Sequence, residues 1–307
     1  MERKKIIIDT DIGDDIDDAF AIALAMASPE LEILGVTTVY KNVVQRAHIT
    51  KKLLSCGGFS QVPVYAGINE PIKQPVAQFP CETMGENGLI TLRHYDEKMN
   101  EYAYDEGSAI DFILDTADKY PSEVSLVAIG PLTNVAAAYQ KRPESFAKLK
   151  EVILMNGFFV AQYPEWNVMC DPEACRITYA CGIPVKSVGA NCTHKVEVFE
   201  QDLQRIQNLK GEVGDFLNEM LSIWLKDNKR NCVMHDGLAL SVLYSDYVKL
   251  EKQNVYVPLE EGLRGYTLRV DGKTAIAPTA EVSVSVDARG FLDDMLRRLE
   301  NFKKISN

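Results

Sequence analysis

An acidic segment near the N-terminus is the feature that most limits how this chain can fold. Six aspartates occur within the ten residues from Asp9 to Asp18. Because carboxylates a few ångströms apart repel one another, such a cluster persists mainly where its oxygens hold a hard cation. An acidic first helical turn is the simpler explanation, and it accounts for Asp17 and Asp18. It does not account for Asp9 or Asp11, so we interpret the segment as a metal site.

The residues on either side place this segment in a loop between a strand and a helix. Residues 5–8 form a short β-branched run, typical of a strand buried on both faces in a parallel sheet, and residues 17–26 have helical composition. Gly13 supplies the backbone freedom for a turn. Open α/β sheets bind their ligands in the crevice outside the carboxyl ends of the strands. The segment therefore lies where such a fold places a binding site.

Strand-like and helix-like stretches alternate along the first two thirds of the chain. Strands are predicted at residues 5–8, 31–39, 62–65, 124–129, 152–155 and 185–188, and helices at 17–26, 43–54, 109–119, 134–140 and 172–180. This alternation predicts an α/β fold with a single open, mostly parallel, Rossmann-like sheet and helices on both faces. We expect one domain over residues 1–307.

The remaining segments follow other patterns. Residues 195–244 are mainly helical, strands at 255–257, 265–270 and 282–286 predict a small antiparallel extension, and a closing helix is expected at 291–302. Residues 67–106 lack periodicity and contain several prolines and glycines. Loops of that length are usually functional or disordered.

Composition excludes several classes of partner. The formal net charge of -11 argues against a surface for nucleic acid or anionic membranes, which requires Lys and Arg clusters. No apolar run is long enough to span a membrane, and the apolar stretch at residues 6–8 is too short for a signal peptide. Seven cysteines in such a chain fit reduced thiols. We expect a cytoplasmic protein with a small-molecule substrate.

Polar residues follow several of the predicted strands and define a candidate metal site. Asp11, Asp18 and Asp236 could each give an oxygen to a cation, with a backbone carbonyl at a strand end as a fourth donor. Oxygen donors indicate calcium or magnesium rather than zinc, and calcium is favoured because it accepts six to eight ligands in loose geometry. An EF-hand is excluded, because its loop needs Gly and Glu where this chain has Asp14 and Phe20.

Other candidates have simpler explanations. His235 directly before Asp236 is more often a structural pair than a catalyst, although the neighbouring candidate ligand favours catalysis. Glu165 and Asn167 could belong to a solvated loop, and Asn42 could cap a helix.

Taken together, these residues resemble the inosine-uridine-preferring nucleoside hydrolases. The matching segments, in order, are Asp9-Thr10-Asp11-Ile12-Gly13 with Asp17-Asp18-Ala19, Val36-Thr37-Thr38-Val39 with Asn42, Gly130-Pro131-Leu132-Thr133-Asn134, Glu165-Trp166-Asn167 with Asp171-Pro172-Glu173-Ala174, and His235-Asp236. One aspartate cluster would be weak support, whereas five segments in order are specific.

The resemblance implies a set of roles. Calcium would be bound by Asp11, Asp18, Asp236 and the main-chain carbonyl of Ile129, and Asp11 would also take the proton from the attacking water. The ribose would be held by residues from several loops, namely Asp17, Asn42, Glu165 and Asn167, with Met155 lining the sugar. His235 would face the leaving base. Relatives are commonly homodimers or homotetramers, so the same is expected here.

The implied chemistry is physically consistent. Cleavage of the C1′–N bond builds positive charge on the ribose, which a group of carboxylates stabilises. The same negative field would repel a 5′-phosphate, so neutral nucleosides rather than nucleotides are the expected substrates.

The chain departs from the family pattern at two places. Asp14-Asp15-Ile16 lie between Gly13 and the aspartate pair, which we place at Asp17-Asp18 because Ala19 follows; in the other register, Asp14 and Asp15 would take the metal roles. Met84 stands where the family commonly has a base-contacting His. Base preference therefore does not follow from the sequence.

Two other readings compete. A phosphatase of the haloacid dehalogenase type also begins with a strand and Asp-x-Asp; Asp9 would be its nucleophile and Mg²⁺ its metal, but Asp14 stands where Thr or Val is usual. A non-catalytic nucleoside- or sugar-binding relative is suggested by Met84, whereas Asp11 and His235 argue against it.

Overall fold

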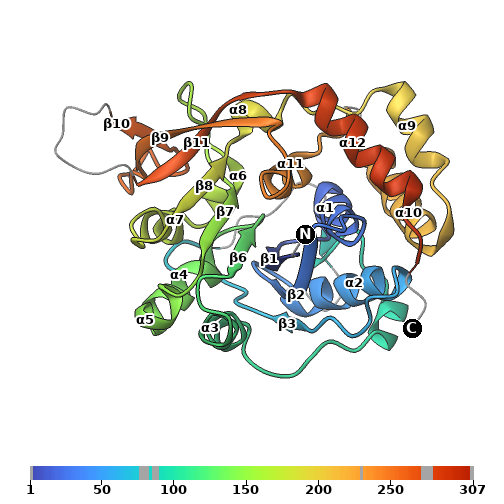
Figure 1. Cartoon of the computed structure of the whole chain (residues 1–307), viewed down its shortest axis with the longest axis horizontal. Helices are drawn as coiled ribbons and strands as arrows, with labels where there is room; N and C mark the ends of the chain where they lie inside the picture. Colours follow the sequence, from blue (N-terminus) through green and yellow to red (C-terminus); the bar gives the residue numbers. More distant parts are fainter. Residues whose placement is uncertain (1–2, 76–82, 85–89, 229–230, 271–278, 305–307) are drawn as a thin grey trace.

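The sheet that organises this molecule is open and mostly parallel. The structure, a computed structural model, describes residues 3–75, 83–84, 90–228, 231–270 and 279–304. Nine strands lie in the order β10-β9-β11-β8-β7-β6-β1-β2-β3 (Figure 1). They are β1 (Lys4–Thr10), β2 (Leu31–Thr38), β3 (Val64–Ala66), β6 (Val124–Ala128), β7 (Glu151–Met155), β8 (Val185–Val188), β9 (Val248–Tyr256), β10 (Leu268–Val270) and β11 (Ala280–Val286). The predicted fold class is confirmed.

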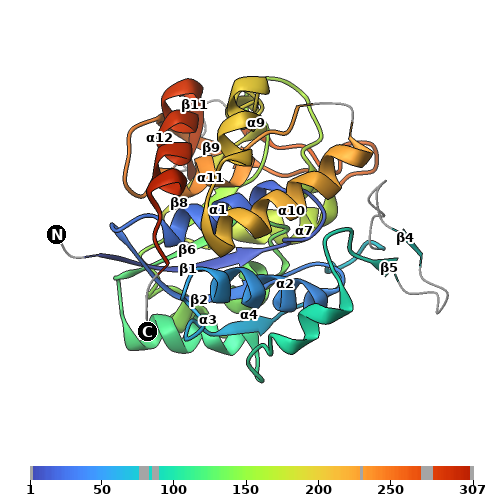
Figure 2. The same cartoon turned by 90° about the vertical axis from the view of Figure 1, so that its right-hand side faces the viewer.

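Helices cover both faces of this sheet (Figure 2). They are α1 (Asp17–Met26), α2 (Val43–Cys56), α3 (Ala109–Lys119), α4 (Thr133–Lys141), α5 (Pro143–Phe146), α6 (Trp166–Cys170), α7 (Pro172–Tyr179), α8 (Ala190–Thr193), α9 (Glu200–Gln207), α10 (Gly211–Asp227), α11 (His235–Ser241) and α12 (Ala288–Asn301), with a 3-10 helix at Glu97–Glu101. Strand β1 shows why two layers are needed. Ile6 and Ile8 pack in the core on the side of α1, α11 and α12, whereas Ile7 packs in the core formed with α3, α4 and α7.

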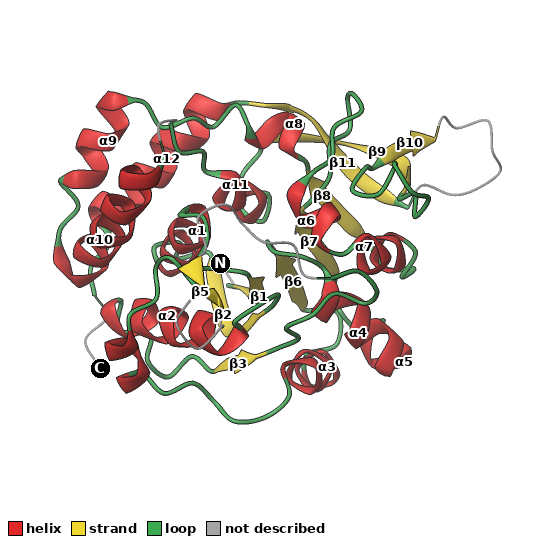
Figure 3. Ribbon diagram, turned by 180° about the vertical axis from the view of Figure 1, so that it is seen from behind, coloured by secondary structure: helices red, strands yellow, loops and turns green. Residues whose placement is uncertain are grey.

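The antiparallel extension is confirmed but larger than predicted. Strand β9 pairs with β11 on one side and β10 on the other, both antiparallel, and it begins at Val248 rather than at residue 255 (Figure 3). Its first half is the segment Lys249–Gln253, of mostly charged residues that remain partly or fully exposed. Few side chains are buried along a strand at the edge of a sheet, so such a strand lacks the apolar pattern from which a strand is predicted.

The long aperiodic segment contains little regular structure among its described residues. Two short strands, β4 (Thr83–Met84) and β5 (Ile90–Thr91), pair antiparallel. Residues 85–89, which follow Met84, lie outside the described residues.

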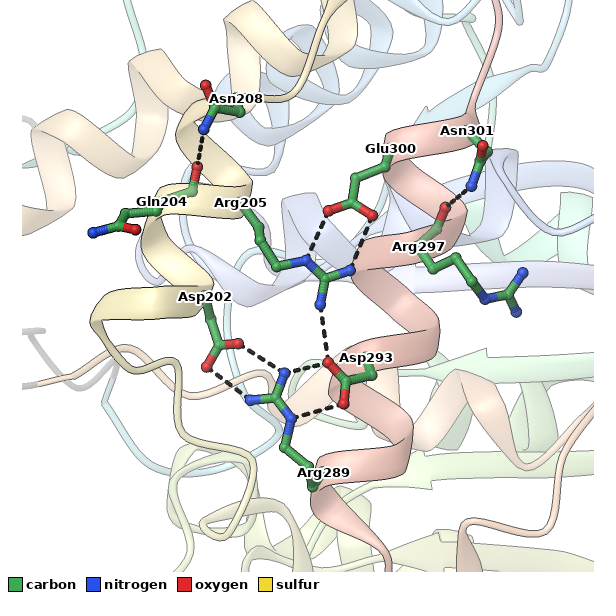
Figure 4. Close-up of polar contacts among 9 residues, drawn as sticks. All are labelled: Asp202, Gln204, Arg205, Asn208, Arg289, Asp293, Arg297, Glu300 and Asn301. Carbon is green, nitrogen blue, oxygen red and sulfur yellow. Dashed lines mark hydrogen bonds and ion pairs between the residues drawn. The ribbon is translucent and has the colours of Figure 1, made fainter.

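Ion pairs join two outer helices that are far apart in sequence (Figure 4). Arg205 of α9 contacts Glu300 at 2.7 Å and Asp293 at 2.9 Å, both on α12. Arg289 of α12 contacts the fully buried Asp202 of α9 at 2.9 Å. Exposed pairs contribute little, but a buried carboxylate needs its partner, so we expect the pair of Arg289 and Asp202 to contribute more than the pairs of Arg205. Within the described ranges, no helix is both long and apolar enough to cross a membrane.

Candidate active site

A cavity of about 350 Å³ lies at the carboxyl ends of the central parallel strands β1, β6 and β7. Its lining consists of Asp11, Asp14, Asp15, Asp17, Asp18, Ile129, Met155, Tyr163, Pro164, Glu165, Trp166, Asn167, Met169, Ala190, His194, His235 and Asp236. Every residue predicted for the site is in this set except Asn42. The strand-end rule for α/β sheets therefore located the cavity.

Three carboxylates form the densest acidic group of the cavity. Oxygen atoms of Asp17, Asp18 and Asp236 lie within 4.8 Å of one another, and all three side chains are buried. Asp17 and Asp18 begin α1 and Asp236 is the second residue of α11, so the packing of these two helices brings them together. Burial raises the pKa of each well above its usual range, and the neighbouring carboxylates raise it further. A bound cation would relieve both effects.

Asp11 lies beside this group at the end of β1. Its charge raises the pKa of Asp18, while its own pKa is raised to about 6 by burial, against the opposing effect of the Arg46 guanidinium. Gly130 explains how the carboxylate fits, because a Cβ there would lie 2.7 Å from Asp11 Oδ1. Glycine at this position therefore lets the end of β6 approach the acidic loop.

Asp9 has a structural position behind the cavity. It is fully buried, and its Oδ1 accepts hydrogen bonds from Thr37 Oγ1 and from Asn134 Nδ2, the latter at 2.7 Å. Burial raises its pKa to about 7. Since Asp9 does not line the cavity, it cannot reach a substrate there, and the phosphatase reading that made it a nucleophile is not favoured.

The two additional aspartates of the loop have different surroundings. Asp14 forms an ion pair with Arg46 at 2.8 Å, in which the arginine side chain is fully buried. Asp15 lines the cavity and accepts a hydrogen bond from the backbone of Ile16. Neither belongs to the group of three, which supports placing the aspartate pair at Asp17 and Asp18.

Glu165 and Asn167 close the side of the cavity next to β7. Glu165 caps α6 and accepts hydrogen bonds from the backbone nitrogens of Asn167, Val168 and Gly157 at 3.0–3.1 Å. Burial raises its pKa to about 7 despite these bonds. Asn167 Nδ2 donates to the carbonyls of Ile129 and Met155, both at 3.0 Å. The amide therefore ties the ends of β6 and β7 together.

Three of the residues that line the cavity, His235, His194 and Tyr163, carry rings that lie near one another. His235 Nδ1 lies 2.6 Å from Thr193 Oγ1, and the ring of His194 lies edge-on to His235 with centroids 5.3 Å apart. The Tyr163 ring lies 5.6 Å from that of His194. The sequence predicted His235 but not His194, which follows the four-residue helix α8 and carries no pattern that marks it.

Asn42 lies outside the cavity lining. It precedes α2 in a left-handed conformation with φ of 43°, and its side chain does not cap the helix. Its predicted ribose contact stays a prediction.

The comparisons with known proteins agree with this geometry. The chain belongs to the inosine-uridine preferring nucleoside hydrolases, whose family model matches residues 6–293. It is 33% identical to uridine nucleosidase 1 of Arabidopsis thaliana, over 97% of this chain and 94% of that protein, and 30% identical to a pyrimidine-specific ribonucleoside hydrolase of Escherichia coli, over 95% of each. A solved purine-preferring ribonucleoside hydrolase from Gardnerella vaginalis superposes with a TM-score of 0.84 at 28% identity, over 99% of this chain and 100% of that one.

The protein is therefore a hydrolase that acts on the N-glycosidic bond of ribonucleosides. Nucleoside hydrolases are metal-dependent, and Asp17, Asp18 and Asp236 could hold the metal. A non-catalytic binding role is not favoured. The names of these three relatives differ in the base, so none of them defines the base preference of this chain.

Proposed function

We propose that the protein is a calcium-dependent hydrolase of neutral ribonucleosides, which releases the free base and ribose in the cavity described above. The observation that carries this proposal is the buried group of Asp17, Asp18 and Asp236 next to Asp11, with His235 in the lining of the same cavity.

The donors at the floor of the cavity fit calcium. We assign the cation to Asp11, Asp18 and Asp236, whose carboxylate oxygens hard cations prefer, and we assign Asp17, the third member of the buried group, to the ribose. The Ile129 carbonyl accepts one hydrogen bond from Asn167, and because a carbonyl has two lone pairs, it can also serve a cation. Calcium bound there would orient the ribose hydroxyls and make a nearby water more acidic. We favour calcium over Mg²⁺, because calcium accepts six to eight oxygen ligands in loose geometry and so leaves positions for water and ribose hydroxyls.

The remaining roles are those that the resemblance to the family implies. Asp11 takes the proton from the attacking water, and the surrounding carboxylates stabilise the positive charge that develops on the ribose. The ribose hydroxyls are bound by Asp17, Asn42, Glu165 and Asn167, and Met155 lines the sugar. The homodimer or homotetramer expected from the resemblance stays a prediction.

His235 protonates the leaving base in this mechanism. Its Nδ1 is engaged with Thr193, so Nε2 is the atom that would face the base. The variant His235→Ala is expected to lower kcat for natural nucleosides by about 100-fold, a usual effect of losing a general acid. An aryl riboside whose leaving group departs without a proton should be hydrolysed at nearly the original rate. Equal losses on both substrates in steady-state assays would assign His235 another role.

Substrate charge tests the function most directly. Six aspartates and one glutamate line the cavity, and among the described residues no Lys or Arg does. We therefore expect base release from a panel of inosine, uridine, cytidine, adenosine and guanosine. Because the carboxylates repel a phosphate, kcat/KM for the 5′-monophosphates should be lower by about 100-fold or more.

A generic phosphate ester is the control for the alternative chemistry. It should not be hydrolysed, and phosphate release from it would favour the phosphatase reading instead. Comparable hydrolysis of a nucleoside and its monophosphate would contradict the proposed substrate class.

A further inference from the structure

Arg46 is a buried cation beneath the cavity whose role neither the sequence nor the proposed mechanism explains. It is the fourth residue of α2, and its side chain is fully buried. It does not line the cavity. Its three nitrogens contact two separate loops, the turn that follows β2 and the acidic loop that follows β1.

The turn after β2 is strained. Tyr40, Lys41 and Asn42 are consecutive non-glycine residues with φ of 64°, 46° and 43°. This left-handed region is unfavourable for residues with a Cβ, so three in a row persist only where surrounding contacts impose the conformation. The backbone nitrogens of Tyr40 and Lys41 donate to the carbonyls of Ile68 and Asn69 at 2.8 and 2.7 Å.

Arg46 holds the other side of this turn. Its Nε donates to the carbonyls of Tyr40 and Lys41, at 2.7 and 3.0 Å. Both residues are buried, so water cannot replace the arginine as a donor to these carbonyls.

The opposite end of the guanidinium holds the acidic loop. Its Nη1 donates to the carbonyl of Asp11 and, at 2.9 Å, to that of Ile12. Its Nη2 contacts Asp14 Oδ2 at 2.8 Å. The backbone of Asp11 is therefore tied to the same rigid group as the turn that carries Asn42.

We propose that Arg46 is a positioning residue that joins the turn Tyr40-Lys41-Asn42 to the loop Asp11–Asp14, and thereby sets Asp11 relative to the sugar-binding end of the site. This inference rests on the proposed function for the roles of Asp11 and Asn42. Only arginine suits the position, because its planar fork of five donors spans both loops, whereas lysine is a single point of charge.

The variant Arg46→Lys tests the coupling, with Arg298→Lys as a matched control. Arg298 is another largely buried arginine, which contacts Glu30 and Asp294 at 2.8–2.9 Å and lies outside the cavity. For Arg46→Lys we expect calcium affinity, measured by calorimetry, to fall about 10-fold and kcat to fall about 100-fold, as is usual when a group that orients metal ligands is lost. For Arg298→Lys, both should stay within about twofold.

Hydrogen exchange supplies a readout that does not depend on activity. Arg46→Lys should speed amide exchange in residues 10–14 and 38–42 together, whereas Arg298→Lys should leave both segments unchanged. If exchange in the two segments changes as expected but the unmodified enzyme neither binds calcium nor cleaves nucleosides, the coupling stands and the proposed function fails.

A second variant covers the case in which Arg46→Lys does not fold. Adding Lys41→Gly removes the steric strain at φ of 46°, so the double variant should fold and recover slow exchange at residues 38–42. Its KM should approach that of Lys41→Gly alone, while kcat stays low because the acidic loop is still not held. The proposal is overturned if Arg46→Lys, or the double variant in its place, loses thermal stability but keeps calcium affinity and kcat within twofold.

Discussion

Replacing Asp11 with asparagine is expected to lower kcat by about three orders of magnitude without destabilising the fold. The amide keeps the shape of the side chain but cannot accept a proton from the attacking water, and a general base contributes about 10²–10⁴-fold. Because Asp11 is also a proposed calcium ligand, kcat is measured at saturating calcium. The substitution also removes one negative charge from a buried acidic group, so the Tm measured without metal should stay the same or rise. Base release measures kcat, and thermal melting in the presence of a chelator measures the Tm without metal.

Asp15→Asn is the matched control for this prediction. Asp15 lines the same cavity and its charge raises the pKa of Asp17, but no catalytic role is assigned to it. The control makes the same change of charge and should alter kcat by less than about fivefold, since it removes no proton acceptor. If both variants lost activity equally, Asp11 would act through its charge alone, and its assignment as the base would be wrong.

The sequence predicted best those elements whose apolar pattern and end residues match the face that the fold buries. Helix α3 was predicted with the observed bounds, because its apolar face has helical periodicity and Ser108 accepts a hydrogen bond from Asp111 at its start. Strand β8 was also correct, since Val185–Val188 begins and ends with valine and lies between Pro184 and Gly189. The prediction missed the first half of strand β9, because that half lies at the edge of the sheet, where polar residues are tolerated.

The cavity was predictable because strand ends meet at one edge of a parallel sheet. That rule brings Asp11, Ile129 and Met155 together from three neighbouring strands. Asp236 is different, since it reaches the site through the packing of α11 on α1 rather than at the end of a strand.

Residues that act from behind the cavity could not be predicted. Arg46 lies in a helix that also contains several partly exposed polar residues, so periodicity does not show that its side chain is buried. Its contacts to Asp11 and Asp14 span more than thirty positions of sequence. For the same reason, the alternative metal role of Asp14 could not be judged before its ion pair with Arg46 was seen.

Removal of calcium is expected to abolish turnover. Burial and mutual repulsion both raise the pKa of Asp17, Asp18 and Asp236 and so disfavour their charged forms, which a bound cation would favour. Dialysis against a chelator should therefore reduce base release by about 10³-fold or more, and added calcium should restore it. Activity that resisted the chelator fully would contradict the metal-dependent mechanism.

The same cation should stabilise the folded chain, which gives a measurement independent of turnover. A ligand that binds only the folded state at about 100 times its Kd adds about 2.7 kcal/mol, enough to raise the Tm of a chain of this size by about 5 °C. Asp236→Asn removes a proposed ligand and one of the repelling charges at once. This variant should therefore melt at or above the Tm of the unmodified protein in chelator, and gain less from calcium. A full calcium-dependent rise in the Tm of Asp236→Asn would show that the cation binds elsewhere.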